Sequence, residues 1–243
     1  MMINKKRVFL PLLYIWVVLI FGTGCDPGNP ETPEALYRAA VQDAVFAETN
    51  EICDCLVAIT EDNDDLNWNA DRVLVVTFTS FPDSYPEGET IQTWWGETWV
   101  TAVPELKNFC ERIRLTADNQ ILRVEQVLGL PENSGNEWFA ELWVNPDDLY
   151  RPCPDQEITD SICELTFPDN ANNEHIDWFN NQIIESYFQE QKYPWTRLGY
   201  TYNWGNPIDK VGLSEFIIRQ DAEVLVKSLK KFESYCQMLF LEI

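Results

Sequence analysis

Cysteines are the residues of this 243-residue chain most able to form covalent bonds, and six follow position 50. An even number favours disulfides in an exported protein, although six thiols allow fifteen pairings. Cys153 and Cys163 enclose a short loop and are the best candidates for a local disulfide. A disulfide that closes this loop would stabilise the fold by about 2–3 kcal/mol. Cys53 and Cys55 are too close to bond each other easily, so we expect distant partners. The six are Cys53, Cys55, Cys110, Cys153, Cys163 and Cys236.

Metal binding is the alternative use of these thiols. Cys53 and Cys55 form a Cys-x-Cys pair, but His175 is the only histidine in the sequence, and the familiar zinc spacings are absent. The acidic loop 61–71 resembles a calcium loop only loosely, because it lacks the central glycine and terminal glutamate of an EF-hand. We therefore predict disulfides, a solvated loop at 61–71, no metal site and no cofactor.

The segment PWTRLGYTYNWGNP, residues 194–207, concentrates aromatic side chains. Leu198, Tyr200, Tyr202 and Trp204 alternate with smaller or polar residues, which predicts a half-buried strand whose other face, including Thr201, is solvated. A partly open aromatic groove is the alternative, since tyrosine hydroxyls need partners.

Stacking on tryptophan is a second possible chemistry. Nine tryptophans follow residue 24, and Trp95 and Trp99 lie in the segment WWGETW. Such rings suit the binding of a glycan or a protein. The sequence contains little evidence of a catalytic site. His175 and Asp177 are two residues apart on an expected helix, so their side chains lie on different faces. We therefore expect His175 to be structural or exposed to solvent. No serine elbow, phosphate-binding glycine loop or metalloprotease motif is present.

GYTYNWG followed by VGLSEFII resembles, over about 25 residues, the C-terminal part of secreted toxin domains of the ADP-ribosyltransferase type. The resemblance implies a catalytic Glu215 on a late strand and an Arg197 that contacts the nucleotide phosphates. A secreted-type enzyme, either a hydrolase or an ADP-ribosyltransferase-like protein, is thus the alternative to a binding protein. The sequence favours binding, and it leaves the catalytic residues unassigned.

The N-terminus resembles a bacterial lipoprotein signal. Lys5, Lys6 and Arg7 precede an uncharged run of fourteen residues at 8–21, too short to span a bilayer comfortably, and Cys25 follows in the sequence GTGC. The resemblance implies cleavage after residue 24 and acylation of Cys25, with palmitate among the lipids. Several acyl chains give a stable membrane anchor. We therefore expect a protein of the bacterial cell envelope.

Charge and composition restrict the partners. Residues 1–24 contain three of the 17 Lys and Arg and none of the 40 Asp and Glu, so the remaining chain has 14 basic and 40 acidic residues, a net charge of −26. Such a surface repels phosphate backbones, so we expect no nucleic-acid partner. Prolines at every third position from 27 to 33 predict an extended tether at 25–34.

The remainder, 35–243, is long enough for one large core and carries no repeat or low-complexity linker. Its periodicities predict a single α+β domain with an antiparallel sheet, a C-terminal β-meander, several short helices and disulfide staples. We expect helices at 33–48, 104–113, 119–130 and 173–188, a helical turn at 145–148, and strands at 72–80, 90–102, 136–144, 198–204, 212–219 and 222–229.

Overall fold

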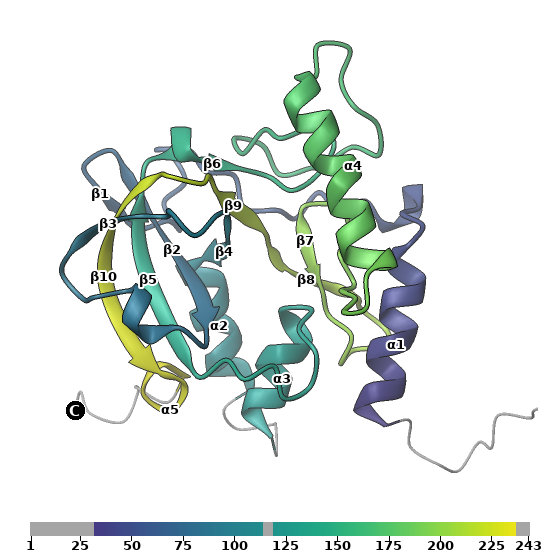
Figure 1. The fold of residues 1–243 in the computed structure, drawn as a ribbon, viewed down its shortest axis with the longest axis horizontal. Helices are drawn as coiled ribbons and strands as arrows, with labels where there is room; N and C mark the ends of the chain where they lie inside the picture. Colours follow the sequence, from purple (N-terminus) through teal and green to yellow (C-terminus); the bar gives the residue numbers. More distant parts are fainter. Residues whose placement is uncertain (1–31, 114–118, 237–243) are drawn as a thin grey trace, which may run out of the picture. The chain divides into compact units, whose positions relative to one another are not determined.

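The computed structural model describes residues 32–113 and 119–236, which belong to one compact unit with the predicted α+β architecture (Figure 1). The signal segment and Cys25 lie outside the described residues. Among those described, no helix has the length and apolar character needed to cross a membrane.

An antiparallel sheet of eight strands forms the centre, in the order β3-β10-β5-β2-β4-β9-β6, with β1 beside β2. The 72–80 segment, apolar on both faces, becomes the central strand β2, and Val73, Leu74 and Val75 are fully buried. The strands are β1 (Trp68–Asn69), β2 (Arg72–Thr79), β3 (Thr90–Gln92), β4 (Thr98–Ala102), β5 (Trp138–Val144), β6 (Leu149–Tyr150), β9 (Phe216–Ile218) and β10 (Glu223–Lys231).

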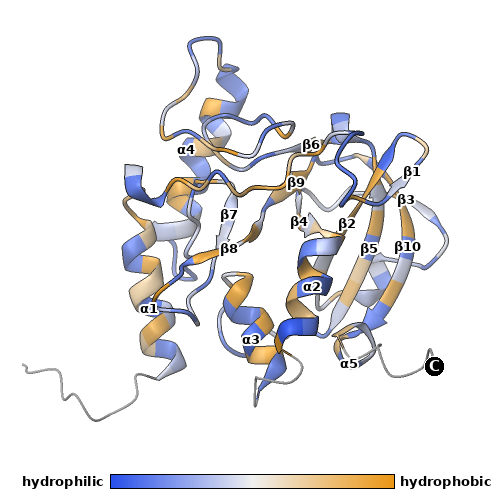
Figure 2. Ribbon diagram, turned by 180° about the vertical axis from the view of Figure 1, so that it is seen from behind, coloured by the Kyte–Doolittle hydropathy of each residue, from blue (hydrophilic) through white to orange (hydrophobic). Residues whose placement is uncertain are grey.

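Helices α2 (Val103–Ile113), α3 (Gln120–Val127) and α5 (Phe232–Cys236) contribute to the core on one face of the sheet (Figure 2). In α2, the predicted apolar stripe, which includes Leu106 and Phe109, is buried in that core. The opposite face carries a second core, in which Val73, Val75 and Leu142 pack against Tyr85 and the loops. The sheet is therefore buried on both sides.

Helices α1 (Pro33–Ala44) and α4 (Asn173–Phe188) lie with a two-stranded hairpin of β7 (Tyr200–Tyr202) and β8 (Val211–Ser214) to one side of this sheet (Figure 1). Thr32 caps α1 as its sequence predicts, and its hydroxyl accepts from Ala35 N at 3.2 Å. The helix ends at Ala44 rather than near 48, because the Arg197 guanidinium binds its last carbonyls. Pro33 and Glu34, expected in the tether, form its first turn.

The segment 90–102 is not one strand as expected. The chain turns at Gly96, whose φ of 123° suits glycine, and the turn separates β3 from β4. Thr93 fixes the start of this turn: its hydroxyl donates to Arg219 O at 2.7 Å and accepts from Ala222 N at 3.0 Å. As a result β3 pairs with β10, while β4 pairs with β2 and β9.

The C-terminal β-meander is confined to the β7–β8 hairpin. Strands β9 and β10 insert into the large sheet at separate places, so they do not pair with β8 or with each other. The chain leaves the hairpin after Ser214, whose backbone N–H and hydroxyl both donate to the buried Glu105 carboxylate. This side-chain contact lies at the end of β8, and β9 begins two residues later at Phe216.

Three disulfides join the six cysteines. The predicted bond between Cys153 and Cys163 is confirmed, with Cα atoms 6.5 Å apart, and Cys110 bonds Cys236 from 126 positions away. The expectation of distant partners for Cys53 and Cys55 is wrong, since the two bond each other with Cα atoms 5.2 Å apart. A bend at the residue between them brings the two side chains to the same side.

Candidate functional site

Strands β2 and β4 diverge, and the site lies where they separate. They pair only at Val75–Ala102 and Val76–Thr101. Beyond these pairs β2 continues along β5 as far as Thr79, whereas residues 98–100 of β4 pair with β9. The β2 segment 77–79 and the β4 segment 98–100 are thus unpaired with each other. We call this opening the fork.

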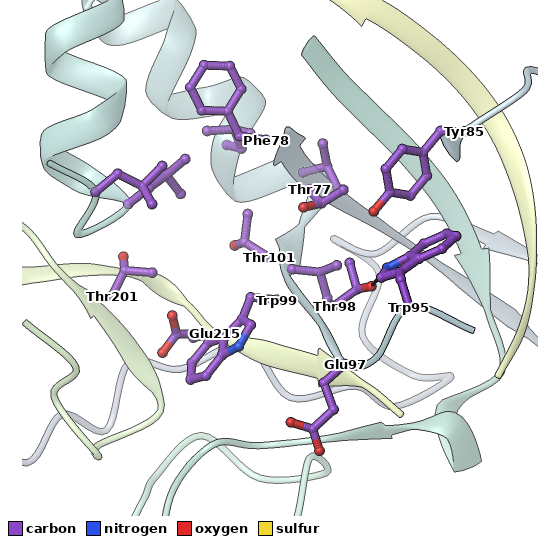
Figure 3. Close-up of a pocket in the computed structure, with 15 residues that line it drawn as sticks. Thr77, Phe78, Tyr85, Trp95, Glu97, Thr98, Trp99, Thr101, Thr201 and Glu215 are labelled. Carbon is purple, nitrogen blue, oxygen red and sulfur yellow. Dashed lines mark hydrogen bonds between the residues drawn. The ribbon is translucent and has the colours of Figure 1, made fainter. Parts of the chain in front are cut away.

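A cavity of about 230 Å³, the fork cavity, fills the opening (Figure 3). The two strands supply hydroxyl groups, from Thr77 on β2 and from Thr98 and Thr101 on β4. The complete lining is Val76, Thr77, Phe78, Tyr85, Trp95, Glu97, Thr98, Trp99, Val100, Thr101, Leu106, Leu128, Leu130, Thr201 and Glu215.

Aromatic side chains form one end of the fork cavity. The Tyr85 and Trp95 rings meet nearly at right angles, with centroids 5.4 Å apart. Trp95 is held in place because its Nε1–H donates to Thr98 Oγ1 at 3.1 Å. The neighbouring Trp94 is 72% exposed and lies edge-on to Trp95, with ring centroids 5.8 Å apart. A row of aromatic rings therefore leads from the surface into the fork.

A second cavity of about 380 Å³, the rear cavity, adjoins the first. Trp195 and Tyr202 give it apolar walls, while Gln182 and Ser186 of α4 supply polar groups. It shares five lining residues with the fork cavity: Trp99, Leu128, Leu130, Thr201 and Glu215. The two cavities are therefore neighbours across these side chains.

Glu215 occupies the boundary between the two cavities. Its backbone N–H donates to Gly199 O at 2.9 Å, which fixes the chain at the exit from β8. No donor among the described residues lies within hydrogen-bonding distance of its carboxyl group. Glu215 is only partly buried as a residue, but the protein packed around its carboxyl disfavours the charged form and raises its pKa to about 8. The group therefore holds a proton at neutral pH.

Two other carboxyl groups near the fork are already bonded. Glu105 accepts from Ser214 and from the Thr101 hydroxyl; burial raises its pKa and these bonds oppose the rise. The Glu97 carboxylate accepts from the Tyr150 hydroxyl at 2.7 Å and from the Trp178 indole at 2.8 Å. Glu215 differs from both in having an unused carboxyl that borders open space.

Electrostatics restrict what the cavities can bind. Among the described residues, no Lys, Arg or His lines either cavity. An anionic ligand would therefore lose its hydration without gaining a compensating cation, which is costly. Hydroxyl groups, aromatic rings and one neutral carboxyl suit an uncharged ligand with both apolar and hydrogen-bonding faces.

The structure brings together residues that the sequence assigned to competing functions. Trp95 and Trp99, expected as stacking platforms, line the fork cavity with Glu215, the acid implied by the resemblance to ADP-ribosyltransferases. Arg197 is not among the residues lining either cavity. Its guanidinium donates to Ala44 O at 3.3 Å and Val45 O at 2.7 Å, so the expected contact with nucleotide phosphates is replaced by contacts with α1.

His175 has a structural role. Burial lowers its pKa, its Nε2 lies 2.7 Å from Cys153 O, and its ring stacks on Trp178 at 5.5 Å. Within residues 32–113 and 119–236, no group of three or more His, Cys, Asp or Glu is arranged to hold a metal.

The alternation predicted for 198–204 does not separate a buried face from a solvated one. Tyr200, Tyr202 and Thr201 are all buried. The reason is that the hairpin packs on both sides: Tyr202 lies in the core with α1 and α4, and the Thr201 hydroxyl donates to Val127 O at 2.5 Å and accepts from Leu213 N at 2.9 Å. The aromatic cluster is thus mainly core, with Thr201 and Tyr202 also bordering the rear cavity.

Thr77, Thr101 and Tyr85 are site residues that the sequence did not single out. The weak signal available was a polar residue between two apolar ones, as Thr77 is between Val76 and Phe78 in RVLVVTFT. Compared with family models, curated proteins and solved structures, the chain matches none.

Proposed function

We propose that this chain is an exported bacterial lipoprotein, anchored through an acylated Cys25, whose fork binds a neutral glycan. One observation carries the binding proposal: in the part of the chain that the structure describes, an opening between strands brings together aromatic rings, threonine hydroxyls and a carboxyl without a hydrogen-bond partner, and no cationic side chain lines it (Figure 3). The membrane is its partner through the lipid, and the cell envelope its location.

Sugars match this lining in two ways. A pyranose ring has an apolar C–H face, which stacks on flat side chains such as Trp95 and Trp99. Its hydroxyl groups form hydrogen bonds with side chains such as Thr77 and Thr101, which supply both donors and acceptors. The combination of mostly apolar walls with a few fixed polar groups is typical of small-molecule sites.

Trp94 supports a glycan that extends to the surface. Its ring is 72% exposed and borders a shallow groove that also includes Trp95, Ile91 and Gln92. An indole left in water beside a cavity is available for stacking on a further sugar unit. The groove and the fork cavity both border Trp95, so the aromatic residues of the surface lie next to those of the cavity.

The anchor proposal rests on the sequence around Cys25, and two features agree with it. The net charge of −26 beyond residue 24 disfavours nucleic acids and anionic headgroups as ligands of the body. The three disulfides suit an oxidising compartment outside the cytoplasm.

The anchor is tested by the variant Cys25→Ala. We expect wild type in the membrane fraction with acyl chains in its intact mass, and the variant in the soluble fraction without them. A variant that stays with membranes contradicts lipid anchoring at Cys25.

Binding is tested with the soluble Cys25→Ala protein on an array of neutral mono-, di- and trisaccharides. In this background, Trp94→Ala should weaken retention about tenfold, because a lone stacking ring is lost. Phe188→Ala is the matched control, since Phe188 is 69% exposed on α4 and lines none of these cavities. Absence of retention on every neutral glycan, or equal effects of the two substitutions, contradicts glycan binding.

A hydrolase is the second candidate, and Glu215 is the observation that favours it. A carboxylic acid that keeps its proton at neutral pH is suited to protonate a leaving oxygen. Incubating a retained glycan with the protein and measuring its mass distinguishes the two functions: shorter products indicate hydrolysis, and an intact glycan indicates binding alone.

A further inference from the structure

The fork cavity and the rear cavity adjoin each other at Glu215. They share Trp99, Leu128 and Thr201, together with Leu130 and Glu215 itself. The fork cavity, at about 230 Å³, is smaller than an ordinary ligand site of roughly 300–1,000 Å³, whereas the two cavities taken together reach that range. The shared residues therefore mark the middle of a longer site.

The two ends of this longer site are chemically alike. Tyr85 and Trp95 provide aromatic surface in the fork cavity, and Trp195 does so in the rear cavity. Polar groups accompany both, with Thr98 at one end and Gln182 at the other. Two similar ends suit a ligand made of two similar units.

Glu215 lies at the boundary of the two cavities, and its carboxyl group has no hydrogen-bond partner among the described residues. The Thr201 hydroxyl beside it is already engaged with Val127 and Leu213. A protonated carboxyl has one O–H to donate, and a ligand with an acceptor oxygen can take the place of water as its partner.

We propose that the two cavities are adjacent sugar subsites, and that Glu215 donates a hydrogen bond to the oxygen that bridges two sugar units bound across it. This inference rests on the proposed glycan binding and names its substrate class: a neutral oligosaccharide of at least two units. A bridging oxygen has no proton, so it accepts a hydrogen bond and cannot donate one. It matches a carboxylic acid better than a carboxylate.

The proton on Glu215 makes this recognition dependent on pH. Ionisation above about pH 8 removes the donor and places a negative charge beside the bridging oxygen. Among the described residues, the titratable and charged groups around Glu215 belong to both cavities and to the neighbouring segments. They are Glu97 and Tyr85 of the fork cavity, Tyr193 and Tyr202 of the rear cavity, Glu105 at Ser214, and Tyr187 with the Arg197 guanidinium over its ring.

The experiment uses the full chain carrying Cys25→Ala and the neutral di- or trisaccharide retained best on the array, with its constituent monosaccharides. Calorimetry at pH 6.5 should give at least tenfold tighter binding of the oligosaccharide than of either monosaccharide. Glu215→Ala should weaken oligosaccharide binding at least tenfold, and Glu215→Gln, which keeps an N–H donor of similar shape, by less than about threefold. Between pH 6.5 and 9, binding by Glu215→Gln should remain flat while binding by the parent protein falls.

The outcomes separate the inference from the function on which it rests. Retention of no neutral glycan overturns both. Glycan retention with equal affinity for monosaccharide and oligosaccharide, or with Glu215→Ala unchanged, overturns the two-subsite assignment and leaves glycan binding intact. Circular dichroism melting of each variant confirms that the proteins compared are folded; a misfolded Glu215→Ala leaves the monosaccharide comparison and the pH profile of Glu215→Gln to decide.

Discussion

Trp99 on β4 and Glu215, the residue just before β9, lie together at the boundary between the fork cavity and the rear cavity. Trp99 pairs with Ile217, two residues after Glu215. Both residues line both cavities. A rigid ladder therefore holds an aromatic ring and an unpartnered acid at the centre of the proposed site.

Glu215 should make stability fall as pH rises from about 4.5 to 8. Below the ordinary pKa of 4.5 the group is protonated in both states; between 4.5 and about 8 only the unfolded chain ionises, which favours unfolding. The full effect is on the order of a few kcal/mol, at about 1.4 kcal/mol per pKa unit and reduced by the partial exposure of the residue. Urea denaturation of wild type and Glu215→Gln across this window measures it, and parallel stability curves would refute the raised pKa.

Glu141 should make the stability of the fold depend on pH in the opposite direction. Burial alone would raise the pKa of Glu141, but contacts from Lys107 at 2.7 Å and Lys227 at 3.0 Å lower it below 4.5. Above pH 4.5 the group is ionised in both states; as the pH falls through 4.5 and then through the folded pKa, the unfolded chain takes up the proton first and stability is lost. Glu141→Gln should lack this acid loss. An equal decline below pH 4.5 in both proteins argues against the lowered pKa.

The Thr201 hydroxyl should be a structural requirement of the hairpin. Thr201→Val preserves the shape but leaves Val127 O and Leu213 N unpaired in a buried place, so we expect a loss of about 1–3 kcal/mol. Thr201→Ser keeps the hydroxyl and is the matched control, with a smaller loss near 0.8 kcal/mol for one methyl group. Urea denaturation compares them, and an equal cost would assign the effect to the methyl group.

The disulfides should differ in what they contribute. Cys110 and Cys236 are 126 residues apart, and removing that bond should cost about 5 kcal/mol in the chain-entropy model. Cys153 and Cys163, ten apart, should contribute about 3 kcal/mol. Paired Cys→Ala variants in urea give the two values, and the reverse order would contradict the entropic account. Thiol titration of the denatured, unreduced wild-type protein should find essentially no free thiol.

Local patterns in the sequence determined much of the secondary structure. The cap at Thr32, the apolar stripe of α2 and the central strand β2 follow from residues close in the chain, because periodicity and capping act over a few positions. The disulfide between Cys153 and Cys163 could be predicted for the same reason, because the two cysteines are only ten residues apart.

Contacts between distant residues decided what the sequence left open. The separation of β3 from β4 depends on Thr93 bonding Arg219 and Ala222, and the end of β8 depends on Glu105 bonding Ser214. No local pattern reports these contacts, because each joins segments more than 100 residues apart. For this reason the sequence wrongly predicted a C-terminal meander of several strands and a single strand at 90–102.

The sequence by itself determined the residue types that the site uses: the tryptophans of WWGETW, and Glu215 between two apolar strands. Only the tertiary structure decided that they belong together. Strand β4 leaves β2 after two pairs to join β9, and this divergence opens a cavity that Trp95, Trp99 and Glu215 line from separate segments. The physical reason is that strand pairing is a long-range choice: alternation specifies which side chains share a face, but not which strand lies alongside or where two strands separate.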